Sequence, residues 1–181
     1  MIGTLEKWQT GDPAAFEELY RQYHLLVFRN AYLITGTKEE AEDVLQEVFV
    51  SVWNARRTFD PEKGKITTWL HRVTVNQCMR RRRKRQPATV SLEKLHIAEF
   101  LRDEGEEEKM VTREEYEILL KALKTLDEKH RAVLVLRYFN ELSYHEIAQA
   151  VGIPVGTVKS RIYQGLKSMR DKINVHEEAS T

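Results

Sequence analysis

The stretch SYHEIAQAVGIPVGTVKSRIYQG, residues 143–165, carries side chains that are suited to contact DNA. Its second half places hydroxyl, amide, ammonium and guanidinium groups at helical spacing, away from the apolar positions Val158 and Ile162. Such groups donate hydrogen bonds to base edges in a major groove and to backbone phosphates. The outward positions are Thr157, Lys159, Ser160, Tyr163, Gln164 and Lys167, with Arg161 at the margin.

Two helices bent around Gly152 would position these donors. Ser143 and Glu146 form a capping box, Gly152 permits a left-handed turn, and Pro154 opens the second helix. This spacing predicts a helix-turn-helix, with an ordinary helical hairpin and a solvated polar face as the less favoured alternative. The buried side of the second helix is predicted to be Val158, Ile162, Leu166, Met169 and Ile173.

A second candidate site for nucleic acid precedes and includes the basic run at residues 80–85. Such a run repels itself unless phosphates or acidic partners neutralise it. The helix leading into it is predicted to turn Ile66, Trp69, Leu70 and Val73 to the core, and His71, Arg72, Val75, Asn76 and Met79 outward. Cations beside aromatic and amide groups suit single-stranded nucleic acid, whereas a solvated helix end is the alternative for a basic run alone.

Neither a catalytic nor a metal site is predicted. Glu39, Glu40, Glu42, Asp43 and Glu47 cluster near one helix start, but no histidine lies at ligand spacing beside them. His71 and Cys78 are one heptad apart without a third ligand. We therefore expect no cofactor.

The predicted elements are all helical, with no strand-like alternation. Asp12-Pro13 starts one helix that Gly36 ends, Thr37 with Glu40 caps the next, and a third begins near Thr67. Upstream of the helix-turn-helix, leucines and valines at helical spacing predict supporting helices.

The second of these helices, with the sequence AEDVLQEVFVSVW, has more apolar residues than one core face needs. Val48 and Val52 point inward, whereas Gln46, Phe49, Val50 and Trp53 could form a partly exposed patch of the kind that binds proteins. Spacing alone favours the other interpretation, in which the aromatic residues complete a three-helix core.

Charge is unevenly distributed over the 181 residues, although the net charge is only +1. Residues 1–86 hold 15 basic and 11 acidic side chains, residues 87–112 hold 3 and 7, and residues 113–181 hold 11 and 10. The acidic middle segment is poor in apolar residues, as linkers are. We expect two small helical domains, at 1–86 and 113–175, an acidic linker at 87–112 and a tail at 176–181.

Composition limits the setting in which the protein works. Hydrophobic residues make up 41% of the chain, no apolar run approaches the length of a membrane span, and MIGTLEKWQTGD lacks a signal-peptide core. The single cysteine, Cys78, cannot form an internal disulfide. These features favour a protein of the reducing cytoplasm.

Four blocks of the sequence resemble, in order, those of bacterial extracytoplasmic-function sigma factors of the sigma-70 family. They are GDPAAFEELYRQY, EEAEDVLQEVFVSVW, FDPEKGKITTWLHRVTVNQCMRRRRKR and LDEKHRAVLVLRYFNELSYHEIAQAVGIPVGTVKSRIYQGLKSMR. The resemblance covers nearly the whole chain outside the acidic linker and the tail. It implies an alternative sigma factor that is not an enzyme, and that recognises promoters, melts the −10 element and initiates transcription.

The resemblance also implies partners and the residues that bind them. Core RNA polymerase would bind through its β′ clamp and β flap, duplex and single-stranded promoter DNA would bind to separate domains, and an anti-sigma factor would cover these surfaces and could hold the protein at the membrane. The implied polymerase-binding residues are Asp43, Gln46, Glu47, Phe49, Val50 and Trp53. Those for the −10 element are Lys65, Ile66, Trp69, Arg72, Asn76, Arg80, Arg81, Arg82 and Arg83, with Trp69 in either a binding or a structural role. Those for the −35 element are Thr157, Lys159, Ser160, Arg161, Tyr163 and Gln164. Related proteins more often carry Arg at positions 159 and 164.

Other classes fit the sequence less well. A stand-alone helix-turn-helix regulator needs a dimerisation element, and no heptad seam is present. A nuclease needs clustered carboxylates or a nucleophile beside a base, and none assembles. A degenerate sigma factor that only sequesters polymerase or an anti-sigma factor is harder to separate, although the intact basic faces favour an active one.

Overall fold

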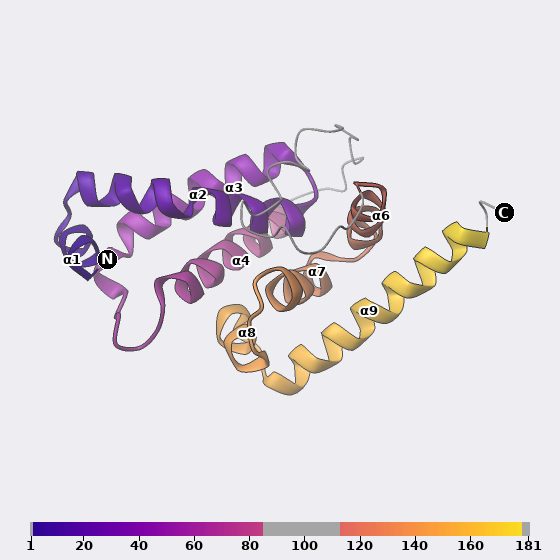
Figure 1. Ribbon diagram of the computed structural model, residues 1–181. Coiled ribbons are helices and arrows are strands. Elements are labelled where there is room, and N and C mark those ends of the chain that lie inside the picture. The colour runs from indigo at the N-terminus through magenta and orange to yellow at the C-terminus, as the bar shows by residue number, and fades with distance from the viewer. Residues whose placement is uncertain (1, 85–112, 179–181) are drawn as a thin grey trace. The chain divides into compact units, whose positions relative to one another are not determined.

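A computed structural model describes residues 2–84 and 113–178. These residues form helices joined by short turns, without any strand, and the prediction of an all-α fold with two helical domains is confirmed. Contacts divide the chain into two compact units, Met1–Gln86 and Pro87–Thr181 (Figure 1). The predicted linker, 87–112, lies outside the described residues, as do residues 179–181 of the predicted tail.

The first unit contains α1 (Ile2–Thr10), α2 (Pro13–Thr35), α3 (Lys38–Asn54), the short 3₁₀ helix η1 (Arg56–Thr58) and α4 (Ile66–Lys84). Asp12 caps α2 by accepting a hydrogen bond from the backbone of Ala14 at 2.9 Å. Gly36 ends α2 with φ 93°, which only glycine adopts without strain. Thr37 then caps α3 through the backbone N–H of Glu40. The predicted boundaries therefore follow from local capping.

The core of the first unit lies where α2, α3 and α4 pack on one another. Val48 and Val52 are buried there, as predicted. The predicted outward face of α4 is wrong at His71 and Val75, which are both buried, whereas Val73 is partly exposed. Because α4 packs against both α2 and α3, its buried face is wider than one apolar stripe. The buried His71 is paired there, since Nδ2 of Asn30 donates to its Nδ1 at 2.9 Å.

The second unit contains α6 (Arg113–Lys124), α7 (Glu128–Leu134), the π-helical turn η2 (Val135–Phe139), α8 (Tyr144–Val151) and α9 (Val155–Glu178). Ser143 and Glu146 form the predicted capping box, and Gly152 ends α8 with φ 71°. The helix α9 packs along α7 and α8 (Figure 1). The predicted helix-turn-helix is therefore present as α8 and α9.

One apolar position predicted for α9 is wrong. Leu166 is 40% exposed and Ile173 is partly exposed, while Gly165 faces the buried side and Val158, Ile162 and Met169 are buried as expected. A Cβ at Gly165 would lie 3.0 Å from Cδ1 of Leu134 on α7. A side chain at this position would therefore require Leu134 to shift by a few tenths of an ångström.

Candidate nucleic-acid and protein interfaces

The outer face of α9 presents the side chains that the sequence predicted for duplex DNA. Val158 and Ile162 are buried beneath it. Tyr163 is 70% exposed, the largest exposed fraction among the large apolar and aromatic side chains that the structure describes as exposed. The set consists of the exposed Lys159, Ser160, Tyr163 and Gln164 and the partly exposed Thr157 and Arg161. These donors can meet a groove without any rearrangement of the core.

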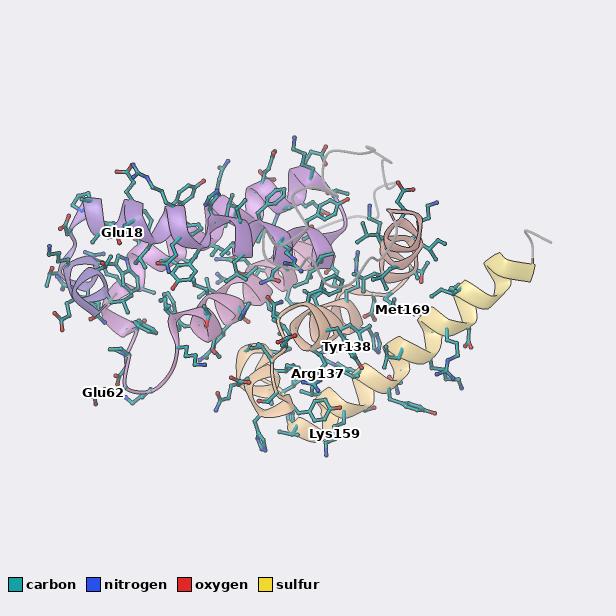
Figure 2. The ribbon with its side chains drawn as sticks, viewed as in Figure 1. Glu18, Glu62, Arg137, Tyr138, Lys159 and Met169 are labelled. Carbon is teal, nitrogen blue, oxygen red and sulfur yellow. The ribbon has the colours of Figure 1, made fainter. Side chains whose placement is uncertain are left out.

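Two further residues, which sequence reasoning missed, extend this face. Tyr144, the first residue of α8, has two cations over its ring: Cζ of Arg137 is 5.3 Å and Nζ of Lys159 is 5.8 Å from the ring centroid. Arg137 is also held by a hydrogen bond to the carbonyl of Leu142 at 3.0 Å. Figure 2 labels Arg137 and Lys159 on their two elements. An aromatic residue directly after the capping Ser143 was the available signal for this cluster.

Gln164 on α9 contacts His130 on α7. Its Oε1 lies 3.3 Å from Nε2 of His130, whose Nδ1 lies 2.8 Å from Oδ1 of Asp127. Asp127 also caps α7 by accepting the backbone N–H of His130. The amide of Gln164 therefore lies beside His130 of α7 on the α9 surface.

The predicted protein-binding patch on α3 is only partly exposed. Val50 is 61% exposed and Gln46 is exposed, and Trp53 is half-buried. Phe49, at 5%, is buried against Phe16 and Tyr20, with ring centroids 6.2 and 4.7 Å away. The expectation of an exposed Phe49 is therefore wrong, because α2 covers this edge of α3.

Trp53 has a defined position at the rim of this patch. Its ring lies 5.1 Å from that of Phe16, and Cζ of Arg56 stacks 4.6 Å from its centroid. Nη1 of Arg56 donates to the carbonyl of Trp53 at 2.8 Å. An indole fixed on two sides and open on a third is suited to anchor a protein partner.

The acidic side of α3 is joined to the basic run of α4. Arg81 places Nη2 2.5 Å from Oδ2 of Asp43 and Nη1 2.7 Å from Oε1 of Glu47. The structure thus brings together residues that were predicted for two different partners. The predicted Arg82 and Arg83 belong to α4, but their side chains lie outside the described residues.

On α4, the predicted DNA-binding residues divide into exposed and buried ones. Lys65, Arg72, Asn76 and Arg80 are exposed. Ile66 is buried and Trp69 is half-buried, with its ring 5.9 Å from Trp8 and 5.6 Å from Phe59. The burial of Ile66 agrees with its predicted inward position, and its side chain is therefore not exposed for contact with DNA.

An open groove runs between α3 and α4 beside Asn76. Its floor is fixed by Nε2 of Gln77, which donates to Oγ of Ser51 at 2.7 Å. The remaining walls offer an amide, a thioether and a guanidinium, which can contact a base and a phosphate. The lining residues are Ser51, Val73, Asn76, Gln77, Met79 and Arg80.

Among residues 2–84 and 113–178, no three potential metal ligands gather. Within the same ranges, no helix has the length and apolar character needed to cross a membrane. The hydrogen bond from Lys63 holds the pKa of Asp60 below its usual value. Both of these side chains are on the surface, which suits loop geometry rather than catalysis.

Comparison with known proteins gives the same two regions in the same order. Residues 19–88 match the family described as Sigma-70 region 2, and residues 116–169 match Sigma-70, region 4. The chain is 31% identical over 177 residues to the ECF RNA polymerase sigma factor SigW of Bacillus subtilis, covering 93% of this chain and 94% of that one. It is also 31% identical over 173 residues to the RNA polymerase sigma-H factor of Pseudomonas aeruginosa, covering 91% and 89%.

Two solved structures share the fold. CnrH in complex with the cytosolic domain of CnrY has a TM-score of 0.67 at 23% identity, over 95% of this chain and 96% of that one. The sigma factor RpoE in complex with the anti-sigma factor NepR from Bartonella quintana has a TM-score of 0.67 at 18% identity, over 88% and 97%.

Proposed function

The chain belongs to the extracytoplasmic-function sigma factors of the sigma-70 family, and from this premise we propose how its surfaces divide the work of transcription initiation. As an alternative sigma factor it directs RNA polymerase to promoters, a role outside the enzyme classes. The first unit would dock on polymerase and hold the −10 strand, and the second would read the −35 duplex. The observation that carries this division is that each unit presents its own exposed face of hydrogen-bond donors, on α4 and on α9.

Docking on the polymerase β′ clamp is assigned to the exposed part of the α3 face. Trp53 and Val50 supply apolar surface, and Gln46, Asp43 and Glu47 supply polar contacts around it. Phe49 would act from beneath, by holding α3 against α2. An aromatic anchor with a polar rim is the usual composition of a protein interface.

The −10 strand is assigned to Lys65, Arg72, Asn76 and the arginines at positions 80–83. The groove beside Asn76 is open and offers both amide and guanidinium groups, as an unstacked base and its phosphate require. Ile66 and Trp69 would shape the start of α4 from within rather than contact DNA.

The −35 duplex is assigned to α9, with Arg137 and Tyr144 added as contacts beside Lys159. The ring of Tyr144 holds both cations on one side of the helix-turn-helix, where phosphates flank a major groove. Each domain alone would bind weakly, and polymerase would combine the two through effective concentration.

An anti-sigma factor is the proposed regulator, acting in the cytoplasm or at the membrane surface. Both solved relatives with this fold are held by such partners or by a cytosolic domain of another protein. The exposed Val50 and Trp53 offer apolar area that a competitor of polymerase could cover.

The deciding experiment is co-elution of the purified full chain with core RNA polymerase that lacks a sigma factor, followed by transcription from promoters selected with that complex. Co-elution and specific transcripts are expected. Co-elution without transcripts from any selected promoter would favour the alternative of a sequestering protein. Failure to co-elute would contradict the docking assignment.

A further inference from the structure

Helix α1 lies outside the stretch that matches Sigma-70 region 2, which begins at residue 19. It is nevertheless firmly packed, since Trp8 is 0% exposed and is among the largest fully buried side chains. Helix α1 contacts η1, and Figure 1 shows α1 at the end of the first unit where the turn leads to α4. What α1 packs against is therefore informative about that turn.

Three rings, Trp8, Phe59 and Trp69, form an aromatic cluster at this end. The ring centroids of Trp8 lie 6.1 Å from Phe59 and 5.9 Å from Trp69, and those of Phe59 and Trp69 are 5.6 Å apart. Phe59 immediately precedes the loop 60–65, and Trp69 lies in the first turn of α4. Trp8 therefore contacts the chain on both sides of the loop.

Gln9 also holds Phe59, the residue at the first end of the loop. Its Nε2 donates to the carbonyl of Phe59 at 2.5 Å. The bonds made within the loop are local: Glu62 and Lys63 donate to Asp60, and residues 61–65 are exposed (Figure 2 labels Glu62). Local bonds set the shape of the loop, whereas its position relative to α4 depends on its ends.

We infer that Trp8 and Gln9 are positioning residues for the loop 60–65 and for the start of α4, so that α1 is part of the −10 strand site without touching DNA. This inference rests on the proposed role of Lys65, Arg72 and Asn76. Because the loop is held at both ends, Lys65 at its last position is kept at a fixed distance from Arg72 on α4. We expect removal of the Trp8 ring to loosen that distance.

The state of the indole nitrogen of Trp8 makes Trp8→Phe a matched control for Trp8→Ala. Nε1 is buried and has no hydrogen-bond partner in the part of the chain that the structure describes. Trp8→Phe therefore keeps an aromatic ring in the cluster and breaks no hydrogen bond there, while Trp8→Ala removes the ring. Leu5→Ala removes apolar packing from the same helix while all three rings remain in the chain.

The test uses the full chain in complex with core polymerase, on promoter DNA selected with the wild-type complex. Opening is followed by the permanganate reactivity of unpaired thymines, and polymerase affinity is measured separately. We expect Trp8→Ala to reduce opening about tenfold, with polymerase affinity within about twofold of wild type. Trp8→Phe should restore opening, and Leu5→Ala should leave it unchanged.

Wild-type opening by Trp8→Ala, or an equal loss in Leu5→Ala, would overturn the inference. If circular dichroism shows that Trp8→Ala does not fold, Gln9→Ala decides, since it removes one hydrogen bond from a half-exposed side chain. A reduction of about three- to tenfold is expected for it, and normal opening would overturn the inference. If the wild-type complex binds the promoter but never opens it, the proposed −10 function itself fails, and the positioning role falls with it.

Discussion

Nη2 of Arg81 on α4 lies 2.5 Å from Oδ2 of Asp43 on α3. The same guanidinium reaches Glu47 through its other terminal nitrogen. The contact joins the face proposed for polymerase to the basic run proposed for DNA. A carboxylate pair that neutralises Arg81 in the free protein lowers the attraction of this end of α4 for phosphate.

Neutralising that pair should strengthen DNA binding by the free protein. In the variant Asp43→Asn with Glu47→Gln, Arg81 is released, and we expect a higher affinity for single-stranded DNA at low salt. One added phosphate contact steepens the log–log salt dependence by about 0.7 for single strands. Fluorescence anisotropy across a salt series measures this slope. Glu42→Gln, whose ion pair is with Lys38, is the control, and an equal change in both variants would contradict the role of Arg81.

Polymerase affinity should depend on the exposed part of α3. Gln46→Ala alters an exposed side chain, and Trp53→Ala removes the indole beside Phe16 and Arg56. We expect losses in affinity of about tenfold or more for Trp53→Ala, as for an interface anchor, and a smaller loss for Gln46→Ala. Titration of labelled protein with core polymerase gives both values. Unchanged affinity in both variants would remove the docking assignment.

Recognition of the −35 duplex should depend on the cations beside Tyr144. Lys159→Ala and Arg137→Ala should each weaken protection of −35 DNA while polymerase binding is unaltered. Tyr144→Phe keeps the ring beside both cations and removes only the hydroxyl, so it should behave much like wild type. Tyr144→Ala should resemble the two cation variants. Footprinting of the complete polymerase complex would show this, and full −35 protection in Lys159→Ala would count against the assignment.

Two glycines of α9 should respond differently to the same substitution. Nothing lies within 4 Å of a Cβ at Gly156, so Gly156→Ala should stabilise the second unit by about 0.5–1 kcal/mol through helix propensity. At Gly165 the added methyl group must displace Leu134, which offsets that gain. Thermal and urea unfolding should therefore rank Gly156→Ala above Gly165→Ala, and the reverse order would contradict the close approach of α7 and α9.

The hydrogen bond between Lys63 and Asp60 in the loop 60–65 should be detectable in the titration of Asp60. Lys63 lowers the pKa of Asp60 mainly through a side-chain hydrogen bond. Because the folded pKa lies below the unfolded one, the contribution to stability is present at neutral pH and is lost as pH falls through the folded pKa. Carbon NMR of Asp60 should show its pKa rising towards the ordinary value in Lys63→Ala. An unchanged titration would mean that Lys63 does not hold Asp60 in solution.

The sequence by itself determined where α2, α3 and α8 start and where α2 and α8 stop. Asp12, Gly36, Ser143 and Gly152 act through bonds and torsion angles within a few residues of themselves, so their effects could be predicted without knowing the fold. The outward donors of α9 were predictable for a related reason. Apolar residues at three- and four-residue spacing show which side of an amphipathic helix is buried, and the polar side then faces outward.

Only the tertiary structure decided which residues at the margins of those faces are buried or paired. Phe49 is covered by α2, His71 and Val75 are buried although they were predicted to face outward, and Arg81 is paired with two carboxylates that lie 34 and 38 residues earlier in the chain. The role of Trp8 was invisible for the same reason. Burial and ion pairing depend on which helix faces meet. These contacts join segments far apart in the sequence, and the spacing of residues within one helix does not reveal them.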